Sequence, residues 1–270
     1  MAEKEKKEKI MKVVVCVKLV DGELNPFDAC ALETALQIEE AHITVLAMGP
    51  IGWQEKLKNL TRYPIGDVIL LSDTAFAGSD TLATGYILSL AIQKLQPDLV
   101  LCGRQSIDGD TAQVGPCLAQ LLGYELHTNV MKPGLRSVVT QMGEELLNFP
   151  AVLTIERINT LRFFSIRSKI RPIHIWNAAD LQADLSRCGQ KGSPTVVVKS
   201  FENNRGQRHC QWIEPETLPN LLKELQDRVR RQDMEETGER LDRIYTIGEE
   251  PAAMARTAAK EVIVLPKEEP

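Results

Sequence analysis

One stretch of polar and glycine residues, 106-SIDGDTAQVG-115, could hold a phosphate group. It follows the apolar run 98–102 and precedes an apparent helix. Asp110 or Thr111 could cap that helix. The N–H groups of residues 111–114 would then be free at the positive end of its dipole. Such free donors would form a seat for an anion.

The side chains around this turn strengthen the prediction. Thr111 and Gln113 would supply further donors, and Gly115 would let a bulky group approach the backbone. The stretch has neither the lysine of a Walker motif nor the Gly-x-Gly-x-x-Gly spacing of a dinucleotide-binding loop. An ordinary capped turn, with Gly109 relieving a tight bend, explains the same residues. From the residues alone both alternatives stay open.

A second stretch, 162-RFFSIRSKIR-171, is strongly basic. Its composition suits a solvated loop at a strand edge, with Phe163 and Phe164 in the core. The residues alone leave a functional role for this loop open.

Composition excludes several other kinds of chemistry. The chain has 270 residues, 43% of them hydrophobic, and a formal charge of −5, which does not suit a nucleic-acid partner. Its six cysteines include no C-x-x-C pair and its four histidines are scattered, so we expect reduced thiols in the cytoplasm and no metal site. No apolar run approaches the roughly 20 residues of a membrane span. No nucleophile–base pair is apparent, and we expect no catalytic residue.

The elements that must position the first stretch alternate regularly. Short apolar runs separated by helical periodicity predict a parallel sheet covered on both faces, a doubly wound α/β fold. In such a sheet the strand ends and the loops that follow them share one edge, where a ligand crevice forms. Strands are expected at 13–17, 43–48, 67–71 and 98–102, and helices at 27–39, 53–61, 80–95 and 111–122.

The pattern loosens after residue 123. Further strands are expected at 146–155 and 195–199, and a short Ala-rich helix at 251–262. We expect three parts: a charged, solvated leader (1–10), a nucleotide-binding domain (11–213) and an extended C-terminal arm (214–270). The arm has too little apolar surface to fold alone, so it must pack on its own domain or on another chain.

Several segments resemble the β subunit of electron-transfer flavoproteins, and the resemblance spans most of the chain. The run DGDTAQVGP is the most specific of them. The segments are 13-VVVCVKLV-20, 25-NPFDACALETALQI-38, 71-LSDTAFAGSDTLAT-84, 102-CGRQSIDGDTAQVGP-116, 149-FPAVLTIERINTLRFFSIRSKIR-171 and 189-GQKGSPTVVV-198.

The resemblance implies that the crevice binds the phosphates of FAD or, alternatively, of a structural AMP. The form of the run resembles the FAD-bearing, bifurcating group, so we favour FAD. The stretch between Lys18 and Asn25 is shorter than the loop that family members usually carry beside the flavin. The implied phosphate ligands are Asp108, Gly109, Asp110, Thr111, Ala112, Gln113, Val114 and Gly115. The implied adenosine pocket comprises Cys16, Val17, Lys18, Asn25, Met48, Cys102 and Gly103, and Asp80, Thr81 and Arg104 are expected near the flavin.

The resemblance also implies partners. The chain would pair with an α subunit that carries the electron-transferring FAD, and the C-terminal arm would pack on that subunit. Electrons would pass from NADH to a low-potential acceptor, ferredoxin or flavodoxin, and to an acyl-CoA dehydrogenase-type flavoenzyme. Residues 162–171 would be a recognition loop for that enzyme, with Ile166 as an apolar anchor. The steering charges would be Arg162, Arg167, Lys169 and Arg171.

A different class of protein has a similar pattern of elements. An adenine-nucleotide-binding regulatory domain of similar topology would be self-sufficient as a homodimer and would need no flavin. The long tail after Glu214 and the match of the recognition loop argue against it.

Overall fold

The computed structural model describes residues 10–134, 136–195, 218–235, 241–247 and 259–265. The chain divides into two compact units, residues 1–200 and residues 201–270. In the second unit, α5 (Leu218–Glu235) is accompanied by a parallel strand pair, β12 (Leu241–Ile247) and β13 (Ala259–Leu265). Among the described residues, no helix is both long and apolar enough to cross a membrane.

The first unit is built on a nine-stranded sheet. The pairings from β11 through to β7 are all parallel, whereas β8 pairs antiparallel with both β7 and the edge strand β9. The strand order therefore confirms the predicted parallel α/β fold and adds an antiparallel edge. In spatial order the strands are β11 (His174–Trp176), β5 (Asp67–Leu71), β4 (Ala41–Met48), β1 (Met11–Val17), β6 (Leu99–Gly103), β10 (Ala151–Ile155), β7 (Glu125–Lys132), β8 (Ser137–Thr140) and β9 (Gly143–Leu146).

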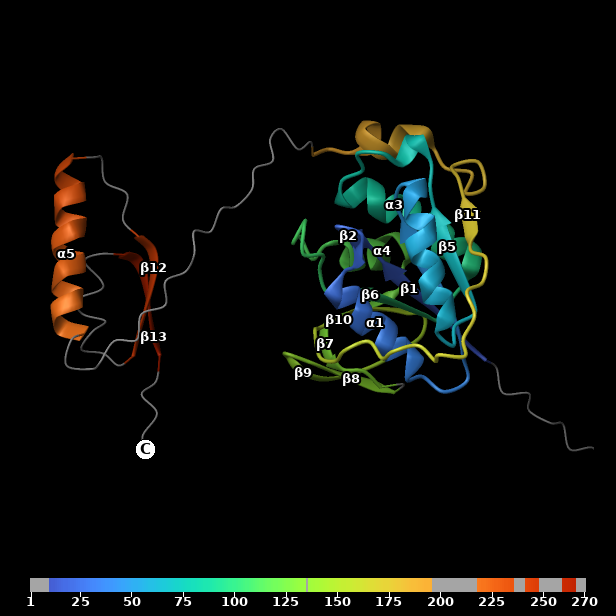
Figure 1. Cartoon of the computed structure of the whole chain (residues 1–270), viewed down its shortest axis with the longest axis horizontal. Coiled ribbons are helices and arrows are strands. Elements are labelled where there is room, and N and C mark those ends of the chain that lie inside the picture. The colour runs from blue at the N-terminus through green and yellow to red at the C-terminus, as the bar shows by residue number, and fades with distance from the viewer. Residues whose placement is uncertain (1–9, 135, 196–217, 236–240, 248–258, 266–270) are drawn as a thin grey trace, which may run out of the picture. The chain divides into compact units, whose positions relative to one another are not determined.

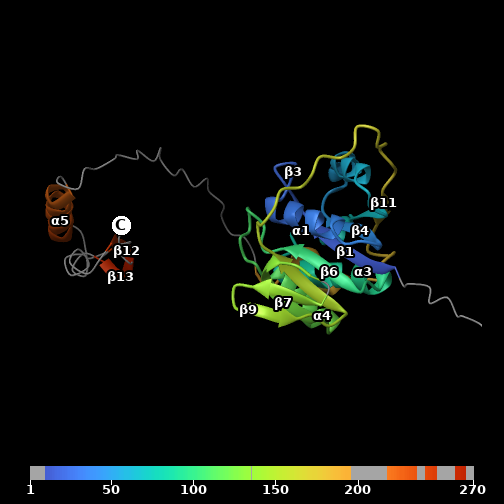
Figure 2. The ribbon, with the colours of Figure 1, turned by 90° about the horizontal axis from the view of Figure 1, so that it is seen from below.

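Helices cover both faces of this sheet. The helix α1 (Pro26–Leu36) and the short α2 (Gln54–Leu57) pack on one face, and α3 (Thr81–Leu95) and α4 (Val114–Leu122) pack on the other. Strand β1 shows why both faces need cover, because Val13, Val15 and Val17 enter one core while Val14 and Cys16 enter the other. In Figure 2, α1 and α4 lie on opposite sides of the sheet.

The strand order makes the carboxyl end of β1 a topological switch point, and the region between the loops that follow β1 and β6 is called the crevice. From β1 the chain proceeds outward through β4 and β5 on one side, and then crosses to β6 on the other side. The loops that leave the carboxyl ends of β1 and β6 therefore diverge at a topological switch point, where ligands of such sheets bind. The β1 loop contains a small hairpin, β2 (Leu19–Val20) with β3 (Glu23–Leu24).

Four predicted elements need correction or fall outside the described residues. Helix α4 begins at Val114 rather than Thr111. The strand expected at 146–155 is two elements, because β9 ends at Leu146 and β10 begins after Pro150, which has no N–H to donate. The helix expected at 251–262 is wrong at its end, which belongs to β13. The strand expected at 195–199 lies almost entirely outside the described residues.

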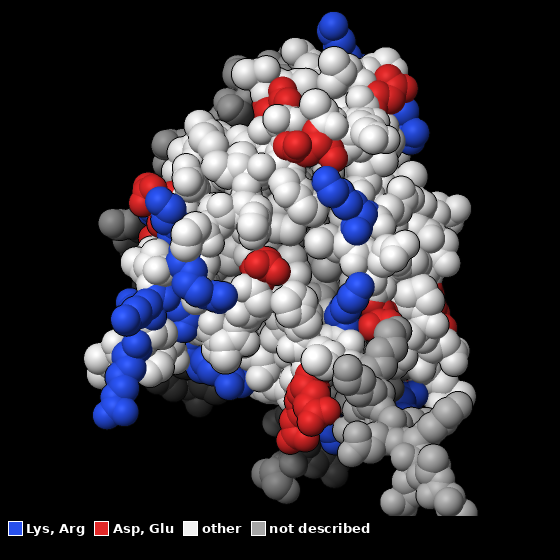
Figure 3. All heavy atoms as spheres, turned by 90° about the vertical axis from the view of Figure 1, so that its right-hand side faces the viewer, with Lys and Arg blue, Asp and Glu red and all other residues white. Residues whose placement is uncertain are grey.

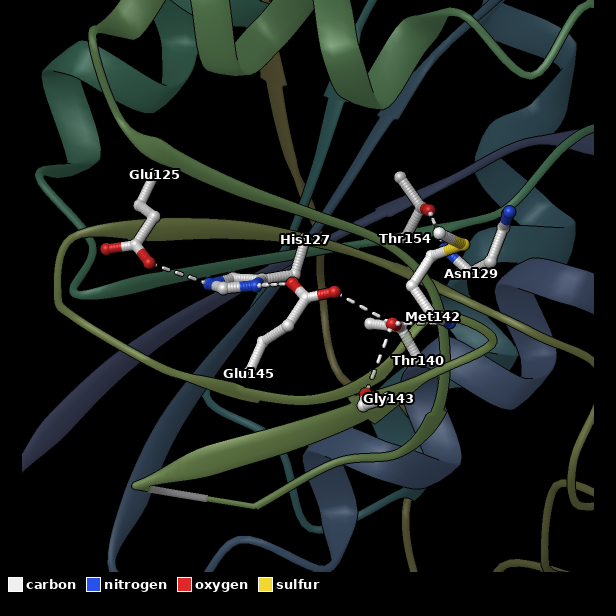
Figure 4. A network of polar contacts seen from close by, with 8 residues as sticks. All are labelled: Glu125, His127, Asn129, Thr140, Met142, Gly143, Glu145 and Thr154. Carbon is white, nitrogen blue, oxygen red and sulfur yellow. Dashed lines mark hydrogen bonds and ion pairs between the residues drawn. The ribbon is translucent and has the colours of Figure 1, made fainter.

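The antiparallel edge is held by a buried histidine (Figure 4). The Nδ1 of His127 on β7 lies 2.6 Å from Glu145 Oε2, and its Nε2 lies 2.9 Å from Glu125 Oε1. The hydroxyl of Thr140 on β8 donates to the other oxygen of Glu145 at 2.8 Å. These contacts tie β9 to β7 across β8.

The described residues include no group of side chains that could hold a metal ion.

Candidate functional site

The loop between β6 and α4 does not cap the helix as predicted. Asp110 and Ala112 both have left-handed backbone, with φ of 52° and 54°. This conformation interrupts the helical path, so the N-cap is Gln113, whose side chain makes no capping hydrogen bond. Asp110 instead donates its N–H to Ser106 O at 2.9 Å and accepts from the Gln105 side chain. The expectation that Asp110 or Thr111 caps the helix is therefore wrong.

The same loop does present free backbone donors. The N–H groups of residues 111–115 donate to no residue that the structure describes. Residues 107–111 and Gln113 are exposed. Left-handed backbone at non-glycine residues costs free energy and is concentrated at functional sites. Residues 108–115, the predicted phosphate seat, thus present N–H donors as expected, although part of this stretch is irregular loop rather than helix.

Gly115 has a structural role that the sequence did not suggest. A Cβ at this position would overlap the methyl group of Thr154 on β10. The Thr154 hydroxyl also accepts the Asn129 N–H at 3.0 Å, at the irregularity in β7 (Figure 4). Glycine at 115 is therefore required where α4 packs on the sheet, whatever the seat binds.

Two buried side chains fasten the β1 loop to the β6 loop. Asn25, 1% exposed, donates from Nδ2 to Gln105 O at 2.9 Å and accepts the Ile107 N–H at 3.4 Å. Asp28, at the start of α1, accepts the N–H of Lys18 at 2.8 Å and of Gly103 at 3.2 Å. Asn25, expected in the adenosine pocket, thus uses its side-chain amide to hydrogen-bond the loop that follows β6. Sequence reasoning missed Asp28, although its place after Asn25-Pro26 at a helix start was a signal.

An ion pair crosses between the two loops nearer the surface. Lys18 Nζ lies 2.6 Å from Asp108 Oδ2, and both side chains are half-exposed. Although partial burial opposes it, the hydrogen bond and charge of Lys18 lower the pKa of Asp108. The seat therefore contains an ion pair, Lys18 with Asp108, and a phosphate could compete with Asp108 for the Lys18 ammonium.

The floor of the crevice is apolar. Cys16 and Cys102 are register partners on β1 and β6, and both are buried, as is Val17. Hydrogen bonding to Cys16 and burial raise the pKa of Cys102 well above its ordinary value, so this thiol stays protonated. Met48, at the end of β4, is half-buried against the core of α3 and α4. These residues make the carboxyl ends of β1, β6 and β4 apolar, and Met48 alone among them is partly exposed.

Two of the three residues expected near a flavin bind other groups of the chain, and the third begins a helix. Arg104 Nη1 lies 2.8 Å from Glu156 Oε1. Asp80 caps α3 by accepting the N–H groups of Leu82 and Ala83, and its other oxygen accepts from Thr195. Thr81 is the first residue of α3. Capping and pairing thus account for Asp80 and Arg104 within the chain.

The recognition loop, residues 162–171, is anchored at both ends. Arg162 makes a bidentate pair with Glu33 on α1, with Nη2 to Oε1 at 2.7 Å. The Arg171 guanidinium donates to the carbonyl oxygens of Thr61, Ile65 and Gly66. Both arginines were expected to steer a partner, but their side chains are occupied in holding the loop.

The apex of this loop is open to solvent. Ile166 is 96% exposed and Phe163 is 98% exposed. The side chains of Arg167 and Lys169 pair with no described residue. Phe164 instead packs beside Tyr63 and beneath the Arg62 guanidinium, 3.6 Å from its ring centre. The expectation that both phenylalanines enter the core is therefore wrong, because Phe163 is exposed and Phe164 is only partly buried, outside both hydrophobic cores.

A hollow of about 550 Å³ lies between the recognition loop and residues 61–65. Its lining includes Arg62, Arg162, Lys169 and Arg171 together with the Phe163 and Phe164 side chains. On the flank of the molecule that carries β11, lysine and arginine side chains form a contiguous group (Figure 3). A second hollow of about 390 Å³ lies beside the start of α3, along residues 186–194. Neither hollow reaches the phosphate seat.

Comparison with known proteins identifies the family. Residues 13–179 match the model of the electron transfer flavoprotein domain. The chain is an electron transfer flavoprotein of the β type.

Named relatives agree with this assignment. The chain is 38% identical over 203 residues to Protein FixA of Azorhizobium caulinodans, covering 66% of this chain and 72% of the relative. It is 42% identical over 201 residues to the electron transfer flavoprotein subunit beta of Megasphaera elsdenii, covering 66% and 74%. It is 39% identical over 196 residues to the caffeyl-CoA reductase-Etf complex subunit CarD of Acetobacterium woodii, covering 66% and 75%.

Membership of the electron transfer flavoprotein family favours a redox role over a self-sufficient regulatory domain. The family match includes the crevice loops and the recognition loop, but ends before the C-terminal arm. Flavin or nucleotide binding by an electron transfer flavoprotein is consistent with a crevice that offers free amides above an apolar floor.

Proposed function

We propose that this chain is the β subunit of a heterodimeric electron transfer flavoprotein and that its crevice binds FAD. The observation that carries the proposal is the row of N–H groups at residues 111–115, beside the switch point of the sheet, which donate to none of the residues that the structure describes. Such donors bind phosphate because they point at the ligand without a competing partner. An α/β crevice of this kind is where nucleotides bind in related folds.

Different residues of the crevice would bind different parts of FAD. The amides of residues 111–115 and the Thr111 hydroxyl would bind the diphosphate, and Lys18 could exchange Asp108 for a phosphate oxygen. Cys16, Cys102 and Met48 would pack against the adenine. A bound FAD supplies one- and two-electron transfer, whereas the chain contributes binding and orientation.

We further propose the route of the electrons. They would come from NADH and divide between a low-potential acceptor, ferredoxin or flavodoxin, and the FAD of an α subunit. That FAD would pass its electron to an acyl-CoA dehydrogenase-type partner, docked on Ile166 of the recognition loop. The similarity to CarD, a subunit of a caffeyl-CoA reductase-Etf complex, supports a partner of this class. The arm, residues 214–270, would pack on the α subunit, and the complex would be cytoplasmic.

A structural AMP is the second candidate ligand, and one observation favours it. Arg104 and Asp80, which a flavin would be expected to contact, are both engaged within the chain. A mononucleotide would use the phosphate seat and the apolar floor without these residues. The chain would then serve only to dock the partner.

Nucleotide analysis of the heterodimer, co-expressed with its α subunit, separates the two candidates. Two FAD per heterodimer and bleaching of both flavins by NADH support the proposed function. One FAD with one AMP supports the alternative. Absence of any adenine nucleotide beyond the α-subunit FAD would refute both.

A substitution in the seat tests where the nucleotide lies. Thr111→Ile replaces the hydroxyl donor with a larger apolar ethyl group within the seat, so it should release the β-subunit nucleotide and leave the α-subunit FAD bound. Thr128→Ile is the matched control, since Thr128 is exposed on β7 and outside the seat. Unchanged stoichiometry in Thr111→Ile would place the ligand elsewhere. Gly115→Glu is not a clean test, because any side chain there meets Thr154.

A further inference from the structure

A single buried carboxylate joins the two loops of the crevice at their roots. Asp28 Oδ2 accepts the Lys18 N–H at 2.8 Å, and Oδ1 accepts the Gly103 N–H at 3.2 Å. Lys18 is the first residue after β1, and Gly103 is the last residue of β6. A Cβ at Gly103 would overlap Asp28 Oδ1, so the close approach of the two elements depends on glycine. Asp28 therefore fixes the spacing of the two loops.

The surroundings of this carboxylate make its charge conditional. Burial raises the pKa of Asp28 to about 7, although the N–H groups of Lys18 and Gly103, the Asn25 amide and the Lys18 charge all act to lower it. The other titratable group facing it is Cys102, with Cys16 beside that thiol. The Lys18 ammonium turns outward to Asp108, so no cation from the described residues pairs directly with the Asp28 carboxylate.

We propose that Asp28 is a positioning residue of the phosphate seat, and that the seat holds its nucleotide more tightly when Asp28 is ionised than when it is protonated. This inference rests on the proposed nucleotide-binding function. It concerns a residue that need not touch the ligand, because Asp28 acts through the roots of the loops that bear Lys18 and residues 108–115.

The reason lies in the number of acceptors. An ionised carboxylate accepts at both oxygens, which suits two N–H donors. Protonation turns one oxygen into a hydroxyl, and the N–H opposite it loses most of its acceptor. The longer bond, to Gly103, is the one expected to yield, and Gly103 leads directly into the seat. The charge of a bound phosphate acts in the opposite direction, because it repels an ionised Asp28 and would weaken binding at high pH. The sign of the pH dependence therefore distinguishes positioning from simple repulsion.

The test is a binding titration of the full-length chain with FAD and with AMP at a series of pH values from 6 to 8. The wild-type dissociation constant should fall by about tenfold as the pH rises, the change expected for one charge-assisted hydrogen bond. Asp28→Asn has no titrating group at position 28, so it should bind both nucleotides weakly, with a flat profile for FAD. Its profile for AMP records only the titration of the AMP phosphate, which has a pKa of about 6 and is subtracted from the wild-type profile. Glu39→Gln, at an exposed position just after α1, removes a charge without touching the crevice and should keep the wild-type profile.

The outcomes are distinct. If the wild type binds a nucleotide equally well across this range, or more weakly at high pH, or if Asp28→Asn keeps the wild-type profile, the role of Asp28 is refuted while nucleotide binding stands. If the wild type binds neither FAD nor AMP at any pH, the proposed function fails and this inference fails with it.

If Asp28→Asn does not fold, NMR spectra of the wild type test the proposal without the variant. The amide protons of Lys18 and Gly103 should titrate together in NMR spectra, with a midpoint near that of the binding profile. Separate midpoints, or a binding profile that follows neither amide, would overturn the proposal.

Discussion

Helix α1 carries two buried carboxylates, Asp28 and Glu33, and each serves a different region of the molecule. Asp28 receives two backbone N–H groups at the crevice, and burial raises its pKa to about 7. Glu33 receives the Arg162 guanidinium at the root of the recognition loop. Although burial opposes it, this pairing lowers the pKa of Glu33. At Asp28 the hydrogen bonds and the charge of Lys18 only partly offset the burial of the carboxylate, whereas at Glu33 the bidentate Arg162 guanidinium more than offsets it.

The two loops differ in what they present as well as in how they are held. The crevice loop presents backbone N–H groups, and side chains such as Asn25 and Lys18 tie it down. The recognition loop presents the side chains of Phe163 and Ile166, and two arginines bind it to the body of the domain. A site made of backbone should tolerate many side-chain changes, whereas a site made of side chains should depend on their identity.

The largest expected effect concerns the pH dependence of stability set by Asp28. Because its pKa is higher in the folded than in the unfolded chain, the folded state binds more protons between about pH 4 and pH 7. The free energy of unfolding should therefore fall as the pH rises through that window, by up to roughly 4 kcal/mol from this group. Denaturant titrations of wild type and Asp28→Asn should show this slope in the wild type only. An equal slope in both would contradict the assignment.

The second effect concerns the ion pair between Glu33 and Arg162 at the base of the recognition loop. Arg162→Met leaves the Glu33 carboxylate buried without its cation, which should cost about 3 kcal/mol of unfolding free energy at neutral pH. The Glu33 contribution is present above its unfolded pKa and lost as the pH falls through its lowered folded pKa, so the wild type loses it only in acid. Arg167→Met, at the solvated apex of the same loop, should be neutral in the same denaturant titration. A loss of similar size in both variants would show that the loop is not held through Glu33.

The third effect separates docking from stability in the recognition loop. Ile166→Glu should weaken the proposed partner docking at least about tenfold, as for loss of a buried anchor, without changing the melting temperature. Electron delivery to the dehydrogenase and the flavin absorption spectrum provide the two measurements. Met142→Glu is the matched control, since Met142 is 92% exposed in the turn between β8 and β9. Normal delivery by Ile166→Glu would refute the anchor assignment.

The smallest effect concerns the strained backbone of the crevice loop. Ala112 has a φ of 54°, which glycine adopts without penalty. Ala112→Gly should therefore be neutral or stabilising by up to about 1 kcal/mol, instead of destabilising as glycine usually is. Ala119→Gly within α4 is the opposite case and should cost about 1 kcal/mol or more, because Ala119 is buried. Thermal unfolding of the two variants compares them directly.

Much of this molecule could be predicted from its sequence because local patterns carry the information. Apolar runs at 13–17, 43–48, 67–71 and 98–102 became β1, β4, β5 and β6, and the fold class followed from their alternation with helices. The sequence also predicted the position of the polar turn, residues 106–115, after the fourth of these strands. The family motifs identified the chain, since they are contiguous stretches of sequence.

Only the tertiary structure decided which side chains serve the site and which hold it in place. Asp28 and Gly103 are distant in the sequence and meet only when β1 and β6 pair, as do Glu33 and Arg162 when the recognition loop folds over α1. The left-handed backbone at Asp110 and Ala112 likewise displaced the start of α4, against the local capping signal. Pairing partners and backbone strain depend on contacts between segments, and no local periodicity records them.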